Sequence, residues 1–136
     1  MRYCKLLIAC CLFFSSCSKP TGVQKLVSDS DSAAINFYKG DGSMDTVVHF
    51  AMIRDKKQIA DLAAFIESSA TENFKCGYDG SLHFFKNNAV LKDIEFRMND
   101  ANCMHFSFIM NGKLYSTKLS DAAKQFLQSV NKTNGK

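Results

Sequence analysis

The segment CMHFSFIMNGKLYSTK (residues 103–118) decides the fold class. It contains two runs rich in aromatic and aliphatic side chains, joined by the dipeptide Asn111-Gly112. Asn-Gly between two such runs is a strong sign of a β-hairpin, because both central residues of a type I′ turn need a positive φ. The segment therefore predicts antiparallel strands at residues 103–110 and 113–118.

Two more β-rich segments precede this hairpin. They are SLHFFK (residues 81–86) and AVLKDIEFRM (residues 89–98), separated by two asparagines. In the second segment, apolar side chains alternate with Asp93, Glu95 and Arg97, as in a sheet with one packed face and one solvated face. Successive hairpins of this kind predict a four-stranded antiparallel meander.

The N-terminal half of the domain predicts another hairpin and a helix. Residues 35–37 alternate between apolar and polar, and after a turn-rich stretch residues 46–53 read TVVHFAMI, which favours two strands. Asp55 and Gln58 have the spacing of a capping box, which satisfies free amides at a helix start. Apolar side chains then recur at helical spacing and predict an amphipathic helix over residues 56–69.

A second helix closes the domain. Ser120 is a favourable N-cap residue, and apolar residues follow it at the spacing of one helix face: Ala123, Phe126, Leu127 and Val130. The predicted order is ββαββββα, an α+β fold in which a two-strand hairpin and a four-strand meander are packed by two helices. We assign this single domain to residues 33–132.

The first twenty residues have the layout of a secretory signal. Arg2 and Lys5 supply positive charge, residues 6–14 are apolar without interruption, and small residues precede Cys17. The apolar run is shorter than the roughly 20 residues that a membrane-spanning helix needs. We therefore expect a cleaved signal peptide at residues 1–16.

The FSSC stretch (residues 14–17) resembles the lipobox of bacterial lipoproteins. The resemblance implies that Cys17 receives a thioether-linked diacylglycerol and becomes the first residue of the mature chain. The LIAC stretch (residues 7–10) also matches a lipobox by residue type, but few apolar residues precede it, so we favour Cys17. An ordinary signal peptide without lipid is the alternative.

Residues 17–32 are expected to form a lipidated tether, because they are mostly small or polar and include the only proline. Two or more acyl chains would hold such a protein at a membrane, whereas one chain gives only reversible binding. The position directly after Cys17 is Ser18 and not aspartate. By resemblance to lipoprotein sorting, this implies the outer membrane, facing the periplasm.

The charge balance gives no sign of nucleic-acid binding. The chain carries 17 Lys and Arg against 13 Asp and Glu, a formal net charge of +4. Cleavage after residue 16 would remove Arg2 and Lys5, and the remaining lysines are scattered along the chain. A nearly neutral protein without a basic run has no electrostatic footprint for a polyanion.

Only two of the six cysteines, Cys76 and Cys103, fall in the predicted domain. In an oxidising compartment two such thiols normally pair, and closing a loop of this length stabilises a fold by roughly 3–4 kcal/mol. A nucleophilic Cys76 with His83 or His105 as its base would need a thiol that stays reduced; Asp79 would orient that base. We therefore expect a disulfide and no catalytic residue.

A zinc site is the other use for these side chains. Cys76, Cys103, His83 and His105 are four ligands of the right types. Their spacings along the chain match none of the short patterns usual for zinc. We therefore expect no metal and no cofactor.

The KCGYDG motif (residues 75–80), the later Cys103 and the NGKLYSTKLS stretch (residues 111–120) resemble small lipoproteins common in Bacteroidota. The resemblance covers about the last half of the domain. It implies an envelope protein and brings no assigned activity with it.

We expect a non-enzymatic domain that binds another envelope protein or a small ligand. Tyr78, Asp79 and Tyr115 are candidates for its interaction surface, because tyrosine is enriched at interfaces. The alternative is an inhibitor of a lytic enzyme, lysozyme or a protease, whose cleft the loop around Tyr78 and Asp79 would enter. A Cys76-dependent enzyme is less favoured.

Overall fold

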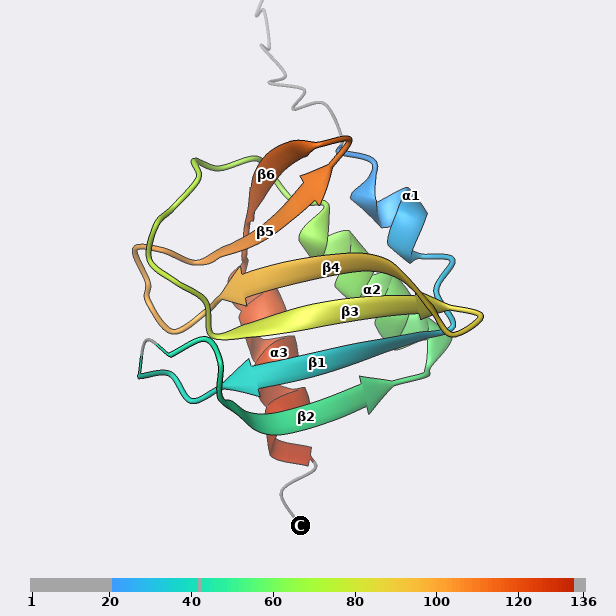
Figure 1. Cartoon of the computed structure of the whole chain (residues 1–136), viewed down its shortest axis with the longest axis horizontal. Coiled ribbons are helices and arrows are strands. Elements are labelled where there is room, and N and C mark those ends of the chain that lie inside the picture. The colour runs from blue at the N-terminus through green and yellow to red at the C-terminus, as the bar shows by residue number, and fades with distance from the viewer. Residues whose placement is uncertain (1–20, 42, 134–136) are drawn as a thin grey trace, which may run out of the picture.

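The computed structural model describes residues 21–41 and 43–133, and these form one antiparallel sheet of six strands with three helices (Figure 1). The predicted signal peptide and Cys17 lie outside the described residues. In chain order the elements are α1 (Val23–Val27), β1 (Ser32–Tyr38), β2 (Val47–Ile53), α2 (Lys56–Ile66), β3 (Gly80–Lys86), β4 (Ala89–Arg97), β5 (His105–Met110), β6 (Lys113–Lys118) and α3 (Asp121–Thr133).

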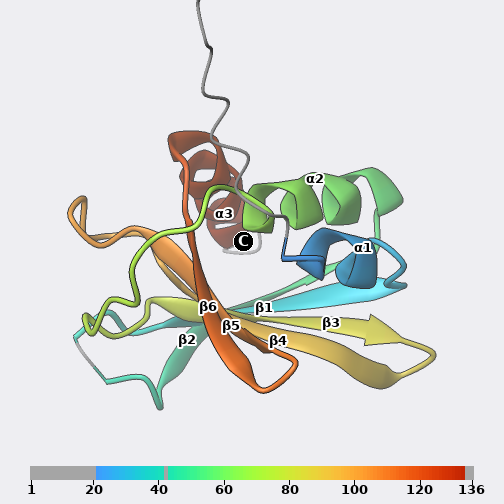
Figure 2. The ribbon, with the colours of Figure 1, turned by 90° about the horizontal axis from the view of Figure 1, so that it is seen from above.

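The strands lie in the order β2-β1-β3-β4-β5-β6, so β1 sits between β2 and β3. The chain leaves the edge strand β2, crosses the sheet as α2 and returns as β3 on the far side of β1. All three helices cover the same face of the sheet (Figure 2). The opposite face has no helix on it, and we call it the open face.

The predicted order of strands and long helices is confirmed, and so is the α+β class. The predicted hairpin and meander join into a single sheet through the β1–β3 pair. The helix predicted to reach residue 69 ends at Ile66. Among the described residues, no helix combines the length and apolar composition needed to cross a bilayer.

Local chemistry explains where several elements begin and turn. The Asp55 side chain accepts a hydrogen bond from Gln58 N at 2.8 Å, and Ser120 Oγ accepts one from Ala123 N at 3.2 Å, as N-caps do. Asn111 and Gly112 have φ of 51° and 74°. Both are positive, as the predicted turn between β5 and β6 requires.

The N-terminal segment corrects the predicted tether. Residues 21–32 belong to the folded domain, where α1 packs against α2 and both Val23 and Val27 are fully buried. These two valines are four residues apart, so one face of a short helix carries both of them. A tether, if it follows Cys17, ends before Thr21.

Glu67 fastens the start of α1 to the end of α2. Its carboxylate accepts hydrogen bonds from Thr21 N, from Thr21 Oγ1 at 2.9 Å and from Gln24 N at 2.9 Å. Burial alone would raise the pKa of Glu67, but these hydrogen bonds outweigh it and lower the pKa. A carboxylate at the first turn also suits the positive end of the helix dipole.

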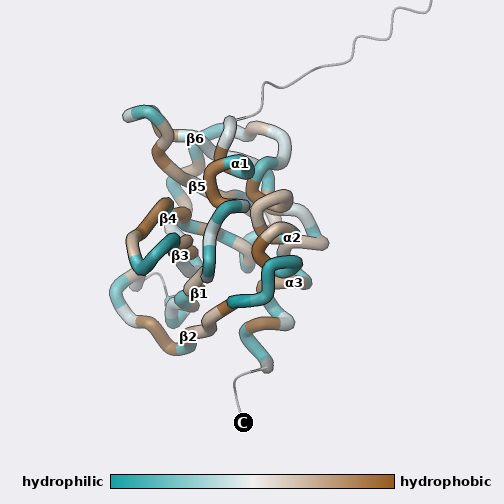
Figure 3. The backbone as a smooth tube through the Cα atoms, turned by 90° about the vertical axis from the view of Figure 1, so that its right-hand side faces the viewer, coloured by the Kyte–Doolittle hydropathy of each residue, from teal (hydrophilic) through white to brown (hydrophobic). Residues whose placement is uncertain are grey.

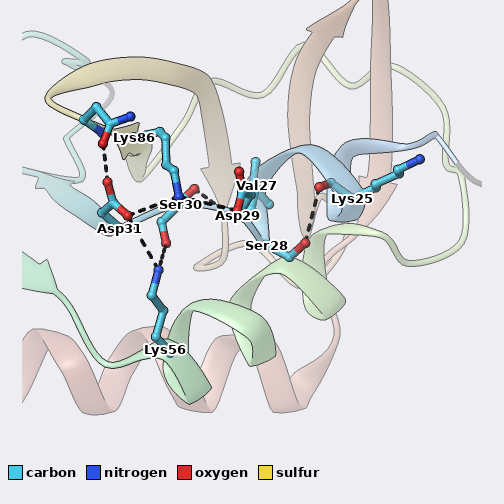
Figure 4. Close-up of polar contacts among 9 residues, drawn as sticks. Lys25, Val27, Ser28, Asp29, Ser30, Asp31, Lys56 and Lys86 are labelled. Atoms are coloured by element: carbon cyan, nitrogen blue, oxygen red, sulfur yellow. Dashed lines mark hydrogen bonds and ion pairs between the residues drawn. The ribbon is translucent and has the colours of Figure 1, made fainter.

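Polar contacts also hold the segment between α1 and β1 (Figure 4). Lys56 Nζ donates to Ser30 O at 2.7 Å, and Lys86 Nζ lies 3.4 Å from carboxylate oxygens of both Asp29 and Asp31. Asn87 N donates to Asp31 Oδ2 at 2.8 Å. Exposed ion pairs add little stability each, so the buried valines carry most of the attachment.

The core lies between the helix layer and the facing side of the sheet (Figure 3). Successive side chains of a strand point to opposite faces, so every second residue of β1, β3, β4 and β5 enters the core. The largest fully buried side chains include three phenylalanines on adjacent strands: Phe84, Phe96 and Phe106. The two long helices supply Ile59, Leu62, Ile66 and Leu127.

Gly80 should tolerate no larger residue. A Cβ at this position would overlap the carbonyl oxygen of Asn36 and the ring of Phe96. Overpacking a core typically costs about 1–3 kcal/mol, and here backbone is one of the obstacles. We expect Gly80→Ala to lower the free energy of unfolding by about 3 kcal/mol in urea denaturation followed by circular dichroism.

Gly40→Ala is the matched control for this experiment. Gly40 has φ of 78°, and a methyl group on its Cα would have no atom within 4 Å. The variant would therefore bear backbone strain of only about 1–2 kcal/mol. Equal destabilisation by the two variants would contradict tight packing over Gly80.

Candidate binding groove on the open face

The open face carries a polar centre. The register of the ladders places the side chains of neighbouring strands side by side on this face: Asn36 and Tyr38 from β1, Ser81 and His83 from β3, Asp93 and Glu95 from β4, and His105, Ser107 and Ile109 from β5. The sequence pattern already places Asp93, Glu95 and Arg97 on the solvated face. The cross-strand pairing adds partners to them.

A chain of hydrogen bonds runs across β1, β3 and β4. His83 Nδ1 lies 2.6 Å from Asp93 Oδ1, and His83 Nε2 lies 2.9 Å from Ser81 Oγ. A carboxylate only accepts, so Nδ1 carries the hydrogen and Nε2 accepts from the Ser81 hydroxyl. Asn36 Nδ2 in turn donates to Ser81 Oγ at 3.3 Å.

This serine–histidine–carboxylate chain has the connectivity of a hydrolytic triad. Ser81, however, is only 2% exposed, and its oxygen already receives the Asn36 amide. A nucleophile must reach a substrate carbonyl, and the oxyanion that forms on this carbonyl needs hydrogen-bond donors beside it. The arrangement therefore fits a network that orients His83 and Asp93 better than it fits an attacking serine.

Glu95 is the carboxylate of this centre whose pKa is shifted. Desolvation by burial raises the pKa of its carboxyl, and nearby Asp93 adds to the rise, while the Tyr38 hydroxyl and His83 oppose it. Tyr38 Oη donates to Glu95 Oε2 at 3.3 Å, and burial raises the pKa of that phenol as well. Perturbed acids in a concave site are a common mark of function.

A groove opens beside Glu95, where β4 and β5 separate. Only residues 95–97 pair with residues 105–107, and beyond them the β5–β6 hairpin tilts away from β4 (Figure 1). The resulting groove has a volume of about 630 Å³. Lys92 Nζ donates to Ile109 O across it.

The groove has apolar walls and an acidic side. Val90 is 54% exposed, Ile109 57% and Leu114 45%, and they line it together with Leu91 and Tyr78. Asp93, Glu95, Ser107 and Lys92 supply its polar atoms, and the Lys92 ammonium is engaged by Ile109 O. Apolar walls with a few convergent polar groups are the usual make-up of a binding site.

The prediction that Asp79 belongs to an interaction surface is wrong. Asp79 is 3% exposed, and its carboxylate accepts from Arg97 Nη1 at 2.9 Å, from Met98 N at 2.7 Å and from Asn99 N at 2.8 Å. A buried carboxylate needs such partners. Asp79 therefore holds the end of β4 and is out of reach of any partner.

The two predicted tyrosines lie on different surfaces. Tyr78 lines the groove on the open face. Tyr115 packs against the core, stacked on Phe108 with ring centroids 6.1 Å apart. They cannot form one interaction surface, because the sheet lies between them.

The predicted cysteine pair is present. Cys76 and Cys103 are joined as a disulfide, with Cα atoms 6.7 Å apart. The loop that carries Cys76 follows α2. Within it, Thr71 N donates to Ser116 O of β6 at 3.0 Å, and Phe74 packs on His105 at the start of β5. The disulfide thereby ties this loop to the sheet.

The structure brings together only some residues of the two alternative sites, the Cys76-dependent catalytic site and the four-ligand zinc site. Cys76, Cys103 and His105 lie together, with one ligand atom of each within 4.8 Å of the others. His83 is not in this cluster and is bonded to Asp93 instead. Asp79, the proposed orienting acid, is engaged by Arg97.

Comparisons of the chain with models of protein families, with curated proteins and with solved structures gave no match. The geometry of the open face therefore carries the functional argument.

Stability should depend on pH through Glu95. Its pKa in the folded state is raised above the ordinary 4.5, so the folded chain binds the proton more tightly, and this stabilisation is lost as pH rises through the raised pKa. Glu95→Gln removes the titration. We expect the melting temperature of the variant, measured relative to that of the wild type, to increase as pH rises from about 4 to about 8.

Glu72→Gln is the control, because Glu72 lies exposed in the loop after α2. Its melting temperature should follow the wild type throughout. A difference between Glu95→Gln and wild type that stays constant over the whole pH range would contradict the buried-acid interpretation.

Proposed function

We propose that this protein is a lipid-anchored binding domain of the cell envelope, and that its groove takes an extended peptide segment with a basic side chain. The groove between β4 and the β5–β6 hairpin, with apolar walls and two carboxylates, is the observation that carries the proposal. The lipobox-like FSSC stretch at residues 14–17 supports the anchor.

The strands beside the groove favour a peptide as the occupant. The β4–β5 ladder stops at Glu95, so an extended segment that enters the groove lies along strand edges, as in β-strand addition. Val90, Ile109 and Leu114 then offer apolar contacts for alternate side chains of the segment. Main-chain hydrogen bonds give affinity in this mode, and the pockets give specificity.

Charge favours a basic residue in that segment. Asp93 is 65% exposed at its side chain, and Glu95 lies beside it on the same face with a raised pKa. A lysine or arginine close to Glu95 would favour its ionised form and form a charge-assisted hydrogen bond. Binding should therefore strengthen as pH rises through the Glu95 titration.

The anchor would keep this groove near the lipid surface. Only three residues separate Cys17 from the described domain, and an extended chain spans at most about 3.6 Å per residue. Leu91 lines both the groove and a second hollow whose other walls are residues of the N-terminal segment: Gly22, Lys25, Leu26 and Asp29. The ligand would therefore be a segment close to the membrane.

A non-catalytic role agrees with the state of the candidate nucleophiles. Cys76 is in a disulfide, and Ser81 is buried beneath its neighbours. Enclosed groups of this kind position other side chains more readily than they attack a substrate.

Peptide display against the full chain tests the groove. We expect enriched peptides to carry Lys or Arg flanked by apolar residues, and their affinity to fall at least about tenfold with Ile109→Glu, which corresponds to about 1.4 kcal/mol. Glu95→Gln should weaken the same peptides. Gln125→Glu, on the exposed side of α3, is the matched control and should bind as the wild type does.

Two results would overturn the groove assignment. One is the enrichment of acidic peptides or of none. The other is equal affinity of the enriched peptides for wild type and Ile109→Glu, with the variant folded by circular dichroism.

An inhibitor of a lytic enzyme is the second candidate. The loop at residues 71–79 is held by a disulfide, and Tyr78 remains partly exposed on it, as in a rigid loop that fills a cleft. Lysozyme and protease assays with the purified chain separate this role from peptide binding.

Anchoring has its own test. We expect Cys17→Ser to move the protein from the membrane fraction to the soluble fraction, because the acyl chains supply most of the membrane affinity. Cys10→Ser should leave the distribution unchanged. The opposite pattern would place the lipid at Cys10, and a wild-type protein found in the soluble fraction would point to an ordinary signal peptide.

A further inference from the structure

His105 has an unused ring nitrogen inside the protein. The side chain is 1% exposed, and its Nδ1 lies 2.7 Å from Cys103 O. A carbonyl oxygen only accepts, so Nδ1 carries the hydrogen and Nε2 presents a lone pair. That Nε2 is buried and has no hydrogen-bond partner among the described residues.

An unpaired buried acceptor is unfavourable, because it has lost its hydrogen bonds to water. Neighbouring rings keep His105 in this position, since Phe74 lies 5.2 Å and Tyr78 5.9 Å from it between ring centroids. The Nδ1–carbonyl bond fixes the tautomer. Histidine ligands of metals are held by the same kind of bond on their second nitrogen.

Two sulfur atoms lie close to the His105 ring. One ligand atom each of Cys76, Cys103 and His105 falls within 4.8 Å of the others. In a tetrahedral zinc site, bonds of about 2.0–2.3 Å place ligand atoms roughly 3.3–3.8 Å apart. Reduction of the disulfide frees the two sulfur atoms to separate toward this spacing, and Nε2 is the ring nitrogen left available because Nδ1 is bonded to Cys103 O.

We propose that the reduced protein binds one zinc ion through Cys76 Sγ, Cys103 Sγ and His105 Nε2. The disulfide and the zinc site are alternative states of the same two cysteines. The inference is independent of the peptide groove, which lies on other residues of the open face.

The chemistry balances with a dithiol as the reductant. The dithiol passes two electrons and two protons to the Cys76–Cys103 bond and becomes a disulfide itself, and the two protein thiols form. Zinc then displaces both thiol protons, because thiolates are the ligands. Two thiolates, one neutral imidazole and Zn²⁺ have no net charge, which suits a buried site.

Three protein ligands leave one coordination position. Cys103 and His105 are buried, whereas Cys76 is partly exposed. The fourth position therefore opens on the Cys76 side, where water or an incoming ligand group completes the tetrahedron.

Metal titration of the full chain tests the site, with the outlying cysteines replaced by C4S, C10S, C11S and C17S. The protein is reduced by a phosphine without oxygen, and zinc is titrated against a chromophoric chelator. We expect one zinc per reduced chain and none per disulfide-bonded chain. Cobalt in place of zinc should give the thiolate charge-transfer band and the tetrahedral ligand-field spectrum.

His105→Gln is the decisive variant, because it keeps both cysteines. Its disulfide-bonded form can be compared with the parent by circular dichroism, which shows whether the variant folds. We expect its zinc affinity to fall at least about tenfold and its cobalt spectrum to change, because one metal ligand is lost. His83→Gln is the matched control and should bind zinc as the parent does.

Three outcomes would overturn the zinc site. The reduced chain could bind no zinc, or His105→Gln could bind it with the affinity and cobalt spectrum of the parent. In the third, the reduced chain unfolds by circular dichroism and zinc fails to restore the fold.

Discussion

Burial of one face of a six-stranded sheet beneath the helices is the constraint on which the rest of this structure depends. The three phenylalanines of adjacent strands, Phe84, Phe96 and Phe106, are fully buried on that face. Side chains alternate along a strand. Because the three phenylalanines face the helices, the residues next to them in each strand face the opposite side of the sheet. The histidine–aspartate pair, Glu95 and the groove are thus consequences of how the core is packed. A register shift of one residue would exchange the two faces.

The open face has a polar part and an apolar part, and their positions depend on whether neighbouring strands pair or separate. Where β3 and β4 pair closely, His83 and Asp93 meet across the hairpin. Where β4 and β5 separate, the walls of a groove remain exposed. The disulfide-tied loop borders this region through Tyr78 and encloses His105. The same loop thus shapes one side of the groove and brings Cys76 close to the His105 ring.

The N-terminal segment from Thr21 onward is part of the folded domain. Val23 and Val27 belong to the core, and Glu67 holds the amides that precede them. If the chain is anchored at Cys17, only three residues separate the lipid from the folded domain. A short link of this kind restricts which faces of the domain are presented outward, in contrast to a long polar linker that lets a domain rotate.

Local sequence patterns by themselves determined the strands, the two long helices, their caps and the Asn111-Gly112 turn, since each depends on a few neighbouring residues. The cysteine count likewise indicated the Cys76–Cys103 pair. Tertiary structure alone decided that Asp79 turns inward to Arg97, that His83 meets Asp93, that α1 is part of the core and that β4 and β5 separate. Periodicity reports which face a side chain occupies. It does not report which distant residue covers that face, because that choice depends on the packing of the whole chain.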